Sequence, residues 1–339
     1  MKRPEIRTEL PGPIARQVLE RDKRFISPSY SRPYEFVMKK GHGVWVYDVD
    51  DNLFLDMNAG IAVLTTGHTH PEIVKVIKEQ TERFIHYSGT DFYYKEQADL
   101  AEKLAEIVPG AQNKKSFLTN SGTEAIETAM KLARYKTKRP IFFAFQGCFH
   151  GRSLGALSLT ASKAVQRRYF SPLLPQVVHI PFPDTYRPPL GANEENITDV
   201  VLDYIEEVIF HQIAPPEEVA AFFIEPIQGE GGYITAPMDF FRRLKELLDK
   251  YDILLVDDEI QSGMGRTGRM FAIEHYGVIP DIVTVAKGIA SGMPLGAAVA
   301  RSSLMDWEPG AHANTFGGNP ISCVAALKTI ELLEGGLIE

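Results

Sequence analysis

The chain has 339 residues, of which 44% are hydrophobic and 24% charged, as in an ordinary globular protein. Its 36 Lys and Arg against 44 Asp and Glu give a net charge of −8, which disfavours nucleic acid as a partner. The composition excludes disorder for most of the chain, and the length fits one large α/β domain or two medium ones.

Cysteine content and hydropathy indicate the compartment. The sequence has two cysteines, Cys148 and Cys323, which cannot form a disulfide framework and fit a reducing environment. The N-terminus lacks the apolar stretch of a signal peptide, and no apolar run approaches the roughly 18 residues that a membrane span needs. We therefore expect a cytoplasmic protein that is not bound to a membrane.

The expected elements follow one another as in an α/β protein. The first 40 residues are polar and interrupted by prolines, and we expect them to wrap over a neighbouring surface. Residues 44–47 and 53–55 predict a β-hairpin. The periodicity then predicts helices over 71–86, 96–107, 123–135 and 238–250, and strands over 141–145, 220–224, 253–256 and 282–285.

Apolar strands that alternate with amphipathic helices predict a mostly parallel sheet covered by helices on both faces. Ligands of such sheets bind beyond the carboxyl ends of the strands. The residues that follow each predicted strand are therefore the candidates for function.

A Ser-Gly-Thr turn, Ser121 to Thr123, opens the helix predicted from residue 123. The free N–H groups and the dipole of a helix start suit an anion such as phosphate. Ser121 with Glu124 three residues later is also the pattern of a capping box. The two interpretations are compatible, and both stay open.

Charged residues follow two other predicted strands. Asp257, Asp258 and Glu259 end an apolar strand, where a buried carboxylate needs a cation opposite; the alternative is a set of solvated acids. Lys287 follows the strand 282–285 and precedes an uncharged, Gly-rich loop. This setting lowers the pKa of an amine, as a Schiff-base lysine requires, although a solvated strand end would look similar.

Two more loops combine glycine with polar groups. The loop 225–232 contains Glu225 and Glu230, and the loop 148–153 places Phe149, His150 and Arg152 close together. A flexible turn and a packed aromatic ring are the alternatives that need no ligand.

Two further motifs are weak. His68 and His70 have no third ligand at a suitable spacing, so we expect no metal site. Gly263 to Gly268 match the dinucleotide fingerprint, but four residues separate them from the strand end and Arg266 stands inside the motif. A nicotinamide enzyme is therefore disfavoured.

Together, the main motifs fit one cofactor. An anion-binding helix start, a buried carboxylate, an aromatic residue near a strand end and a desolvated lysine are what pyridoxal phosphate requires.

The sequence resembles the class III, or ω-amino-acid, aminotransferases of fold type I, and is most similar to 4-aminobutyrate aminotransferase-like members. The matching stretches run in family order from about residue 35 to 325, and include TNSGTEAIETAMKLAR, FQGCFHGRSLGALSLT, IEPIQGEGG, LLVDDEIQSGMGRTGRMFAIEHYGVIPDIVTVAKGIASGMPLGA and HANTFGGNP. The resemblance implies a pyridoxal-phosphate-dependent transferase of fold type I, with a mostly parallel central sheet and only part of a small domain.

The resemblance also implies roles for single residues. Lys287 would form the Schiff base and Asp258 would contact the pyridine nitrogen, and these are the catalytic residues. The remaining cofactor contacts would come from Ser121, Gly122, Thr123, Phe149, His150, Gln261 and Thr315. Phe149 would stack on the ring, Gln261 would contact the phenolic oxygen, and Thr315 would reach the phosphate of a neighbouring subunit. A homodimer with shared sites, or a higher oligomer, follows from that last role.

Substrate contacts are implied for Ile61, Arg152, Glu225 and Glu230, with the guanidinium of Arg152 on the distal carboxylate, a task that suits its planar donors. The implied domains are 1–55, an N-terminal segment and hairpin of the small domain; 56–325, the large cofactor-binding domain; and 326–339, the start of a linker helix. Because family members continue into a C-terminal small domain, we expect a truncated chain whose last helix lacks a partner for its apolar face.

The expected reaction is a ping-pong transfer of an amino group from an amino acid, 4-aminobutyrate or a related ω-amino acid, to a 2-oxo acid such as 2-oxoglutarate. One alternative is an amino-acid racemase on the same scaffold, because the motifs concern the cofactor and not the fate of the proton. A cofactor-binding but catalytically silent truncated chain is the alternative outside the enzymes.

Overall fold

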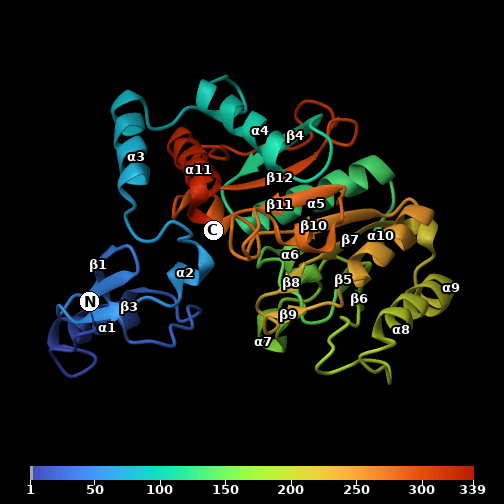
Figure 1. Ribbon diagram of the computed structural model, residues 1–339, viewed down its shortest axis with the longest axis horizontal. Helices are drawn as coiled ribbons and strands as arrows, with labels where there is room; N and C mark the ends of the chain where they lie inside the picture. Colours follow the sequence, from blue (N-terminus) through green and yellow to red (C-terminus); the bar gives the residue numbers. More distant parts are fainter. Residues whose placement is uncertain (1–2) are drawn as a thin grey trace.

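The computed structural model describes residues 3–339. Its largest part is a seven-stranded sheet with the order β4-β12-β11-β10-β7-β5-β6 (Figure 1). Its strands are β4 Lys114–Thr119, β5 Ile141–Phe145, β6 Val177–Ile180, β7 Val219–Ile224, β10 Leu254–Asp258, β11 Ile282–Val285 and β12 Gly296–Arg301. Only β12 runs antiparallel to its two neighbours in this sheet. The prediction of a mostly parallel sheet is confirmed.

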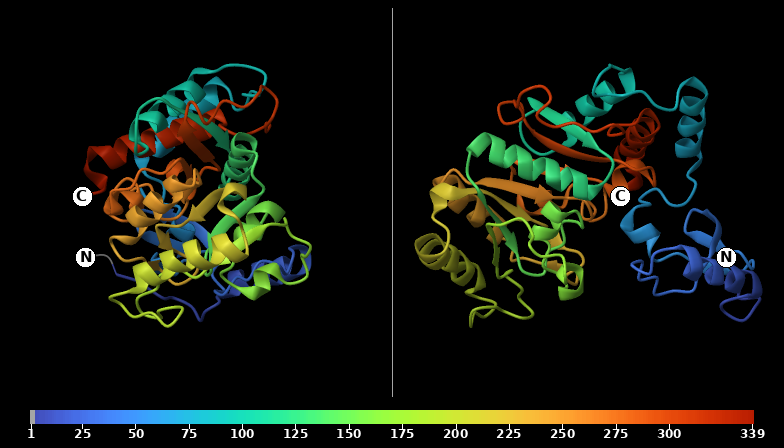
Figure 2. Two further views of the ribbon diagram at one scale, coloured as in Figure 1. Left: turned by 90° about the vertical axis from the view of Figure 1, so that its right-hand side faces the viewer. Right: turned by 180° about the vertical axis from the view of Figure 1, so that it is seen from behind.

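Helices cover both faces of this sheet because its strands are apolar on both sides (Figure 2). Phe142 and Val256 point into one core, with helices α5 and α6, whereas Phe143 and Leu255 point into the other. The helices on the first face are α5 Gly122–Thr137 and α6 Leu154–Leu159; those on the second are α4 Lys95–Ile107, α8 Ile197–Asp203, α10 Phe240–Lys250 and α11 Pro320–Leu332. Each large apolar side chain buried in this way stabilises the fold by about 1.5–3 kcal/mol.

The N-terminal part of the chain stands beside this body (Figure 1). It contains α1 Pro13–Phe25 and a three-stranded antiparallel sheet of β1 Met38–His42, β2 Trp45–Asp48 and β3 Leu53–Leu55. Short α2 Ala59–Ala62 and α3 Pro71–Arg83 connect it to the body. The predicted hairpin is confirmed as β2 and β3, while α1 and β1 were not predicted.

The last helix differs from its prediction. α11 begins at Pro320, before the predicted position 326, because Pro320 suits a first helical turn and Asn319 accepts a hydrogen bond from Ile321 N. It packs against α3 and α4, and Cys323, Ala325, Ala326 and Ile330 are buried. Of the segment 326–339, for which a missing partner was expected, Ala326 and Ile330 are buried, so the expectation is wrong for these two residues. The domain boundaries at 55 and 325 stay predictions.

The parallel strands place their carboxyl ends at one edge of the sheet. β12 lies between β11 and β4 and runs antiparallel to both, so β4 points in the same direction as β11. The segments that follow β4, β5, β7, β10 and β11 therefore all leave from this edge. A two-stranded ribbon, β8 Ile227–Gln228 with β9 Ile234–Thr235, continues the segment after β7. Within residues 3–339, no helix is both long and apolar enough to cross a membrane.

Candidate active site

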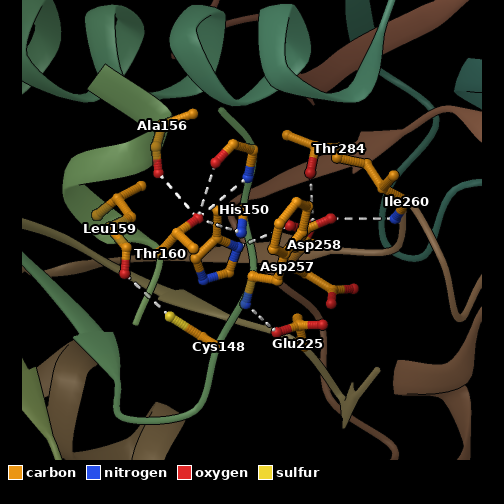
Figure 3. A network of polar contacts seen from close by, with 12 residues as sticks. Cys148, His150, Ala156, Leu159, Thr160, Glu225, Asp257, Asp258, Ile260 and Thr284 are labelled. Carbon is orange, nitrogen blue, oxygen red and sulfur yellow. Dashed lines mark hydrogen bonds and ion pairs between the residues drawn. The ribbon is translucent and has the colours of Figure 1, made fainter. Parts of the chain in front are cut away.

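A buried ion pair marks the end of β10. The Oδ2 atom of Asp258 lies 2.7 Å from Nδ1 of His150, and both side chains are almost fully buried (Figure 3). Ile260 N donates to the other carboxylate oxygen of Asp258 at 3.1 Å, and His150 N donates to Thr160 Oγ1 at 2.9 Å. Burial disfavours the charged ring, but Cys148 and Asp258 together raise the pKa of His150 well above its ordinary value. The imidazole therefore gives this buried carboxylate a cationic partner at the sheet edge.

Asp257 and Asp258, the last residues of β10, and Glu259 directly after it are all buried, so the alternative of solvated strand-end acids is wrong. Successive side chains of a strand point to opposite faces of the sheet, so these three carboxyl groups have different surroundings. Glu259 accepts from Ser262 Oγ and Ile273 N, whereas neither carboxylate oxygen of Asp257 has a hydrogen-bond partner within residues 3–339. Burial raises the pKa of Asp257 well above its usual range and that of Glu259 to about 7. Only Asp258 has a cationic partner and faces the loop after β5.

Glu225 connects two loops of the site. Its carboxyl oxygens accept from Phe149 N at 2.8 Å and from Gly229 N at 3.1 Å, and the side chain is 6% exposed. Burial raises the pKa of Glu225 to about 7. Because both oxygens are engaged by backbone, this residue fixes the positions of Phe149 and the 225–232 loop.

Lys287 lies just after β11 in a left-handed conformation, with φ of 46°. No hydrogen bond or ion pair joins its ammonium group to another of residues 3–339. Burial lowers the pKa of Lys287, and the negative charges of Asp258, Glu225 and Glu230 oppose this effect. A partly desolvated amine without a partner is available as a nucleophile.

The start of α5 is capped by Ser121, as its sequence predicted. Ser121 Oγ accepts from Glu124 N at 3.4 Å, and Glu124 Oε2 accepts from Asn120 N at 2.6 Å, one residue before the position of a standard capping box. The N–H groups of Gly122 and Thr123 belong to the first turn and have no intrahelical acceptor. They remain free to bind an anion.

Close backbone approach shapes this helix start. A Cβ on Gly122 would lie 2.9 Å from Ile260 Cδ1, next to Asp258, and one on Gly151 would lie 2.4 Å from Thr123 Oγ1. Thr123 Oγ1 is also 2.7 Å from Ser153 Oγ. The segments that follow β4, β5 and β10 are therefore packed closely against one another at this helix start.

Phe149 is half-buried, and the guanidinium of Arg152 lies 5.5 Å from the centre of its ring. Arg152 is exposed and has no ion pair with another residue of the described chain. Gln261 Oε1 is buried without a partner. An aromatic face, an unpaired guanidinium and an orphaned amide oxygen are groups that a ligand at this edge could engage.

Ile61 lies on a turn with several residues of positive φ. Ala59, Gly60, Ile61 and Ala62 all have positive φ angles, between 51° and 65°. Asn58 Oδ1 accepts from Ile61 N at 2.6 Å, and Arg266 donates to Ala62 O at 3.3 Å. The Ile61 side chain on this turn is 66% exposed. The strained backbone therefore holds an exposed side chain and does not place Ile61 in the core.

Glu230 forms an ion pair with Lys163 at 2.7 Å and accepts from Gln166 Nε2 at 3.4 Å. Lys163 and Gln166 were not predicted, because they come from a segment near α7 Ala164–Arg167 with no motif of its own. Both residues contact Glu230 from more than 60 positions away in the sequence, and only the tertiary structure reveals such a contact.

Thr315 is not brought to the other predicted residues within this chain. It is exposed on the loop between β12 and α11, and its side chain has no hydrogen bond within the described range. The prediction that it serves a second subunit stays a prediction.

The two weak motifs of the sequence, the His68–His70 pair and the glycines of 263–268, have local structural surroundings that need no ligand. His68 Nε2 lies 2.7 Å from Asp56 Oδ2, which links it to the strained turn. Residues 263–268 form irregular turns, and no helix begins there, so the dinucleotide motif lacks its structural context.

The residues present fit pyridoxal phosphate. Free N–H groups at Gly122 and Thr123 suit its phosphate, and the buried carboxylate of Asp258 suits its pyridine nitrogen. The orphaned Gln261 Oε1 and the partnerless amine of Lys287 are polar groups that such a cofactor would satisfy.

Comparisons with known proteins support the assignment of this cofactor. The family model "Aminotransferase class-III" matches residues 26–337. The chain is 42% identical over 340 residues to an alanine/serine racemase of Pyrococcus horikoshii, covering 98% of this chain and 71% of the relative. It is 44% identical over 313 residues to an acetylornithine aminotransferase of Methanopyrus kandleri, covering 92% of this chain and 74% of the relative.

Among solved structures, an (S)-enantioselective omega-transaminase from Thermomicrobium roseum superposes with a TM-score of 0.87 at 32% identity, covering 95% of this chain and 75% of that one. The match confirms fold type I as the architecture of the described chain. The chain belongs to the class III aminotransferase family, and its cofactor is pyridoxal 5′-phosphate.

Proposed function

We propose that the protein transfers an amino group from an amino acid to a 2-oxo acid such as 2-oxoglutarate, with a donor that carries its carboxylate far from the reacting amine. 4-Aminobutyrate and N-acetylornithine are donors of this kind. The observation that carries the proposal is the partnerless amine of Lys287, which lies at the same sheet edge as the buried Asp258–His150 pair and the open start of α5.

Residues of this chain would hold the cofactor from several sides. Gly122, Thr123 and Ser121 at the start of α5 would bind its phosphate, and Lys287 would attach it through Nζ. Phe149 would support the ring face, and Gln261 would contact the phenolic oxygen. Bound pyridoxal phosphate would supply an electron sink for the C–H bond of the carbon that bears the reacting amine.

Lys287 moves the proton in this proposal. Burial lowers the pKa of Lys287 and so favours the neutral amine, whose Nζ can accept the proton of the substrate carbon and return it elsewhere. Asp258 keeps the pyridine nitrogen protonated, and His150 compensates the buried charge of Asp258.

Arg152 would select the substrate. It is exposed beside Phe149 without an acidic partner, so a substrate carboxylate can take both of its planar donors. This position suits the distal carboxylates of 4-aminobutyrate and 2-oxoglutarate. Ile61 and Glu230 would border the same space, and Glu225 would keep the loops in place.

A homodimer is part of the proposal. Thr315 is exposed and apart from the other site residues of its own chain, and exposed aromatic side chains lie near it in sequence or on the 85–93 segment: Tyr87, Phe92, Tyr93 and Phe316. His86 packs against Phe316 at 4.8 Å, which brings the two segments together. Burial of these side chains against a second copy would complete both sites.

Racemisation is the second candidate, because the chain is 42% identical to an alanine/serine racemase over almost its whole length. Chiral chromatography of L-alanine incubated with the enzyme separates the two. The proposed transfer predicts no D-alanine without a 2-oxo acid, and amino-group transfer once 4-aminobutyrate and 2-oxoglutarate are supplied. Accumulation of D-alanine without any 2-oxo acid would contradict the proposal.

A further inference from the structure

The loop that carries Thr315 is anchored by a histidine. His312 Nδ1 lies 2.9 Å from Lys131 Nζ, and His312 Nε2 lies 3.0 Å from Thr128 Oγ1. Both partners belong to α5. Lys131 Nζ also donates to Ala311 O at 3.1 Å, so one lysine holds two consecutive residues of the loop.

These contacts define the protonation state of the ring. A lysine ammonium can only donate, so Nδ1 of His312 must be the acceptor. The proton of the neutral ring is then on Nε2, which donates to Thr128 Oγ1, and Thr128 donates to Glu124 O at 2.8 Å. Every donor has one acceptor. A second proton on Nδ1 would point at the ammonium of Lys131 and break the chain of hydrogen bonds.

Packing reinforces the neutral ring. The centre of the His312 ring lies 4.6 Å from that of Phe117 on β4 and 5.5 Å from that of Trp307. The charged groups that affect His312 are Lys131, Glu124 and Glu127, all on α5. Burial and Lys131 lower the pKa of His312, and Glu124 and Glu127 oppose them.

The other side of Thr315 is also held. Asn314 Nδ2 donates to Leu118 O at 2.9 Å, and Asn314 O accepts from Thr90 Oγ1 at 2.8 Å. Thr315 is thus an exposed residue next to an anchored segment, and α5 connects its loop to Gly122 and Thr123 at the helix start.

We infer that His312, as a neutral imidazole, is the positioning residue that fixes Thr315 for the cofactor phosphate of the neighbouring subunit, and that its protonation releases this contact. The inference rests on the proposed cofactor-binding dimer. It adds a residue that acts through Thr315 and makes cofactor affinity depend on pH.

The experiment measures the dissociation constant of pyridoxal phosphate for the purified full chain in a pH series from 8 down to 4.5, with the oligomeric state checked by light scattering. His312→Phe keeps an aromatic ring but removes both polar contacts, and we expect about tenfold weaker binding at pH 8. His312→Gln can accept from Lys131 and donate to Thr128 without titrating. It should bind like the wild type at pH 8 and more tightly than the wild type at the acid end of the series.

Two further variants isolate the cause. Lys136→Met is the matched control, because Lys136 is on α5 but pairs with Asp306 and does not contact the 310–319 loop. It should leave affinity unchanged. In a Thr315→Val background, His312→Phe should have no additional effect, since the residue acts through Thr315.

The outcomes are distinguishable. If the wild type binds no pyridoxal phosphate or is a monomer, the proposed function itself fails. If the wild type binds as a dimer, unchanged affinity of His312→Phe, an additive effect with Thr315→Val, or an identical pH response of His312→Gln overturns the inference. Dissociation of His312→Phe into monomers would assign His312 to assembly instead and also overturn it.

Discussion

His150 Nδ1 lies 2.7 Å from Asp258 Oδ2, and both side chains are buried at the end of β10. A carboxylate buried here without this imidazole would be an uncompensated charge in a low-dielectric site. The pair thus gives Asp258 a cationic partner where the proposed function needs a carboxylate. His150 acts on the chemistry through Asp258.

Asp258→Asn removes the charge but keeps the shape of the side chain. We expect kcat/KM to fall by about 10²–10³-fold, since an electrostatic stabiliser is lost. The free energy of unfolding should also fall, by about 3–5 kcal/mol at most, because His150 loses its partner. Steady-state kinetics and urea unfolding measure the two effects. Asp252→Asn, an exposed acid at the other end of β10, is the control; equal activity of both variants would refute the role of Asp258.

Glu225→Gln tests a titration near neutral pH. The pKa of Glu225 is raised to about 7 from an ordinary 4.5 by burial. Between these values the folded protein retains a proton that the unfolded chain has lost, so the stabilising effect is complete below pH 4.5 and is lost as the pH rises through 7. We expect the free energy of unfolding to fall by about 3 kcal/mol across this window.

The glutamine variant should be less stable at low pH and lack this particular dependence. Urea unfolding at pH 5, 6, 7 and 8 compares it with the wild type and with Glu217→Gln, an exposed residue just before β7. Parallel pH profiles of Glu225→Gln and the wild type would show that Glu225 does not titrate in this range.

Arg152→Gln should act on substrate selection. Loss of a charge pair with a carboxylate typically costs at least 2 kcal/mol, so KM for 4-aminobutyrate should rise about 30-fold or more. KM for an amine without a carboxylate should not change. Arg187→Gln offers a matched control, since its guanidinium also lies over an aromatic ring, at 5.6 Å from Tyr186. A similar rise in KM for both kinds of donor would argue against Arg152 as the carboxylate site.

Lys287→Ala should abolish covalent attachment of the cofactor and lower the rate of proton transfer by about 10²–10⁴-fold. Mass spectrometry after borohydride reduction detects the attachment: the wild type should carry the added mass on the peptide with residue 287. Lys328→Ala, which removes a partly buried lysine paired with Glu331, should behave as the wild type does. Reducible attachment that persists in Lys287→Ala would show that another lysine holds the cofactor.

Strong local patterns predicted much of the fold. Runs such as 141–145 and 282–285 became β5 and β11 with the predicted limits, because uninterrupted apolar runs of this length suit a strand buried on both faces. β4 and β12 were missed for opposite reasons. Lys114 and Lys115 open β4 with charge, and β12 is rich in alanine, so neither has a typical strand composition.

Helix α1 was missed although its signal is present. Pro13 stands at the first helical position, and Lys23 and Arg24 lie in the last turn, where they suit the helix dipole. The polar character of the segment concealed these signals, because α1 buries little: Ala15 is its only buried residue.

Some residues of the candidate site could be predicted from the sequence, and others could not. Lys287, Asp258 and Gly122 follow strands or begin a helix, so their placement at one edge follows from the order of the elements. Lys163 and His312 could not be found in this way, since their partners Glu230 and Lys131 are distant in sequence. The burial of Glu225 likewise depends on contacts with two loops and not on its own motif.

Transfer of nitrogen is the central claim, and an isotope measures it directly. The enzyme with pyridoxal phosphate is incubated with 4-aminobutyrate labelled with nitrogen-15 and with 2-oxoglutarate, and glutamate is analysed by mass spectrometry. We predict labelled glutamate in amounts equal to the donor consumed, and none with Lys287→Ala. Consumption of N-acetylornithine in place of 4-aminobutyrate, with the same label in glutamate, would still support amino-group transfer. Absence of labelled glutamate with every donor, while L-alanine is converted to its D-isomer, would contradict the account.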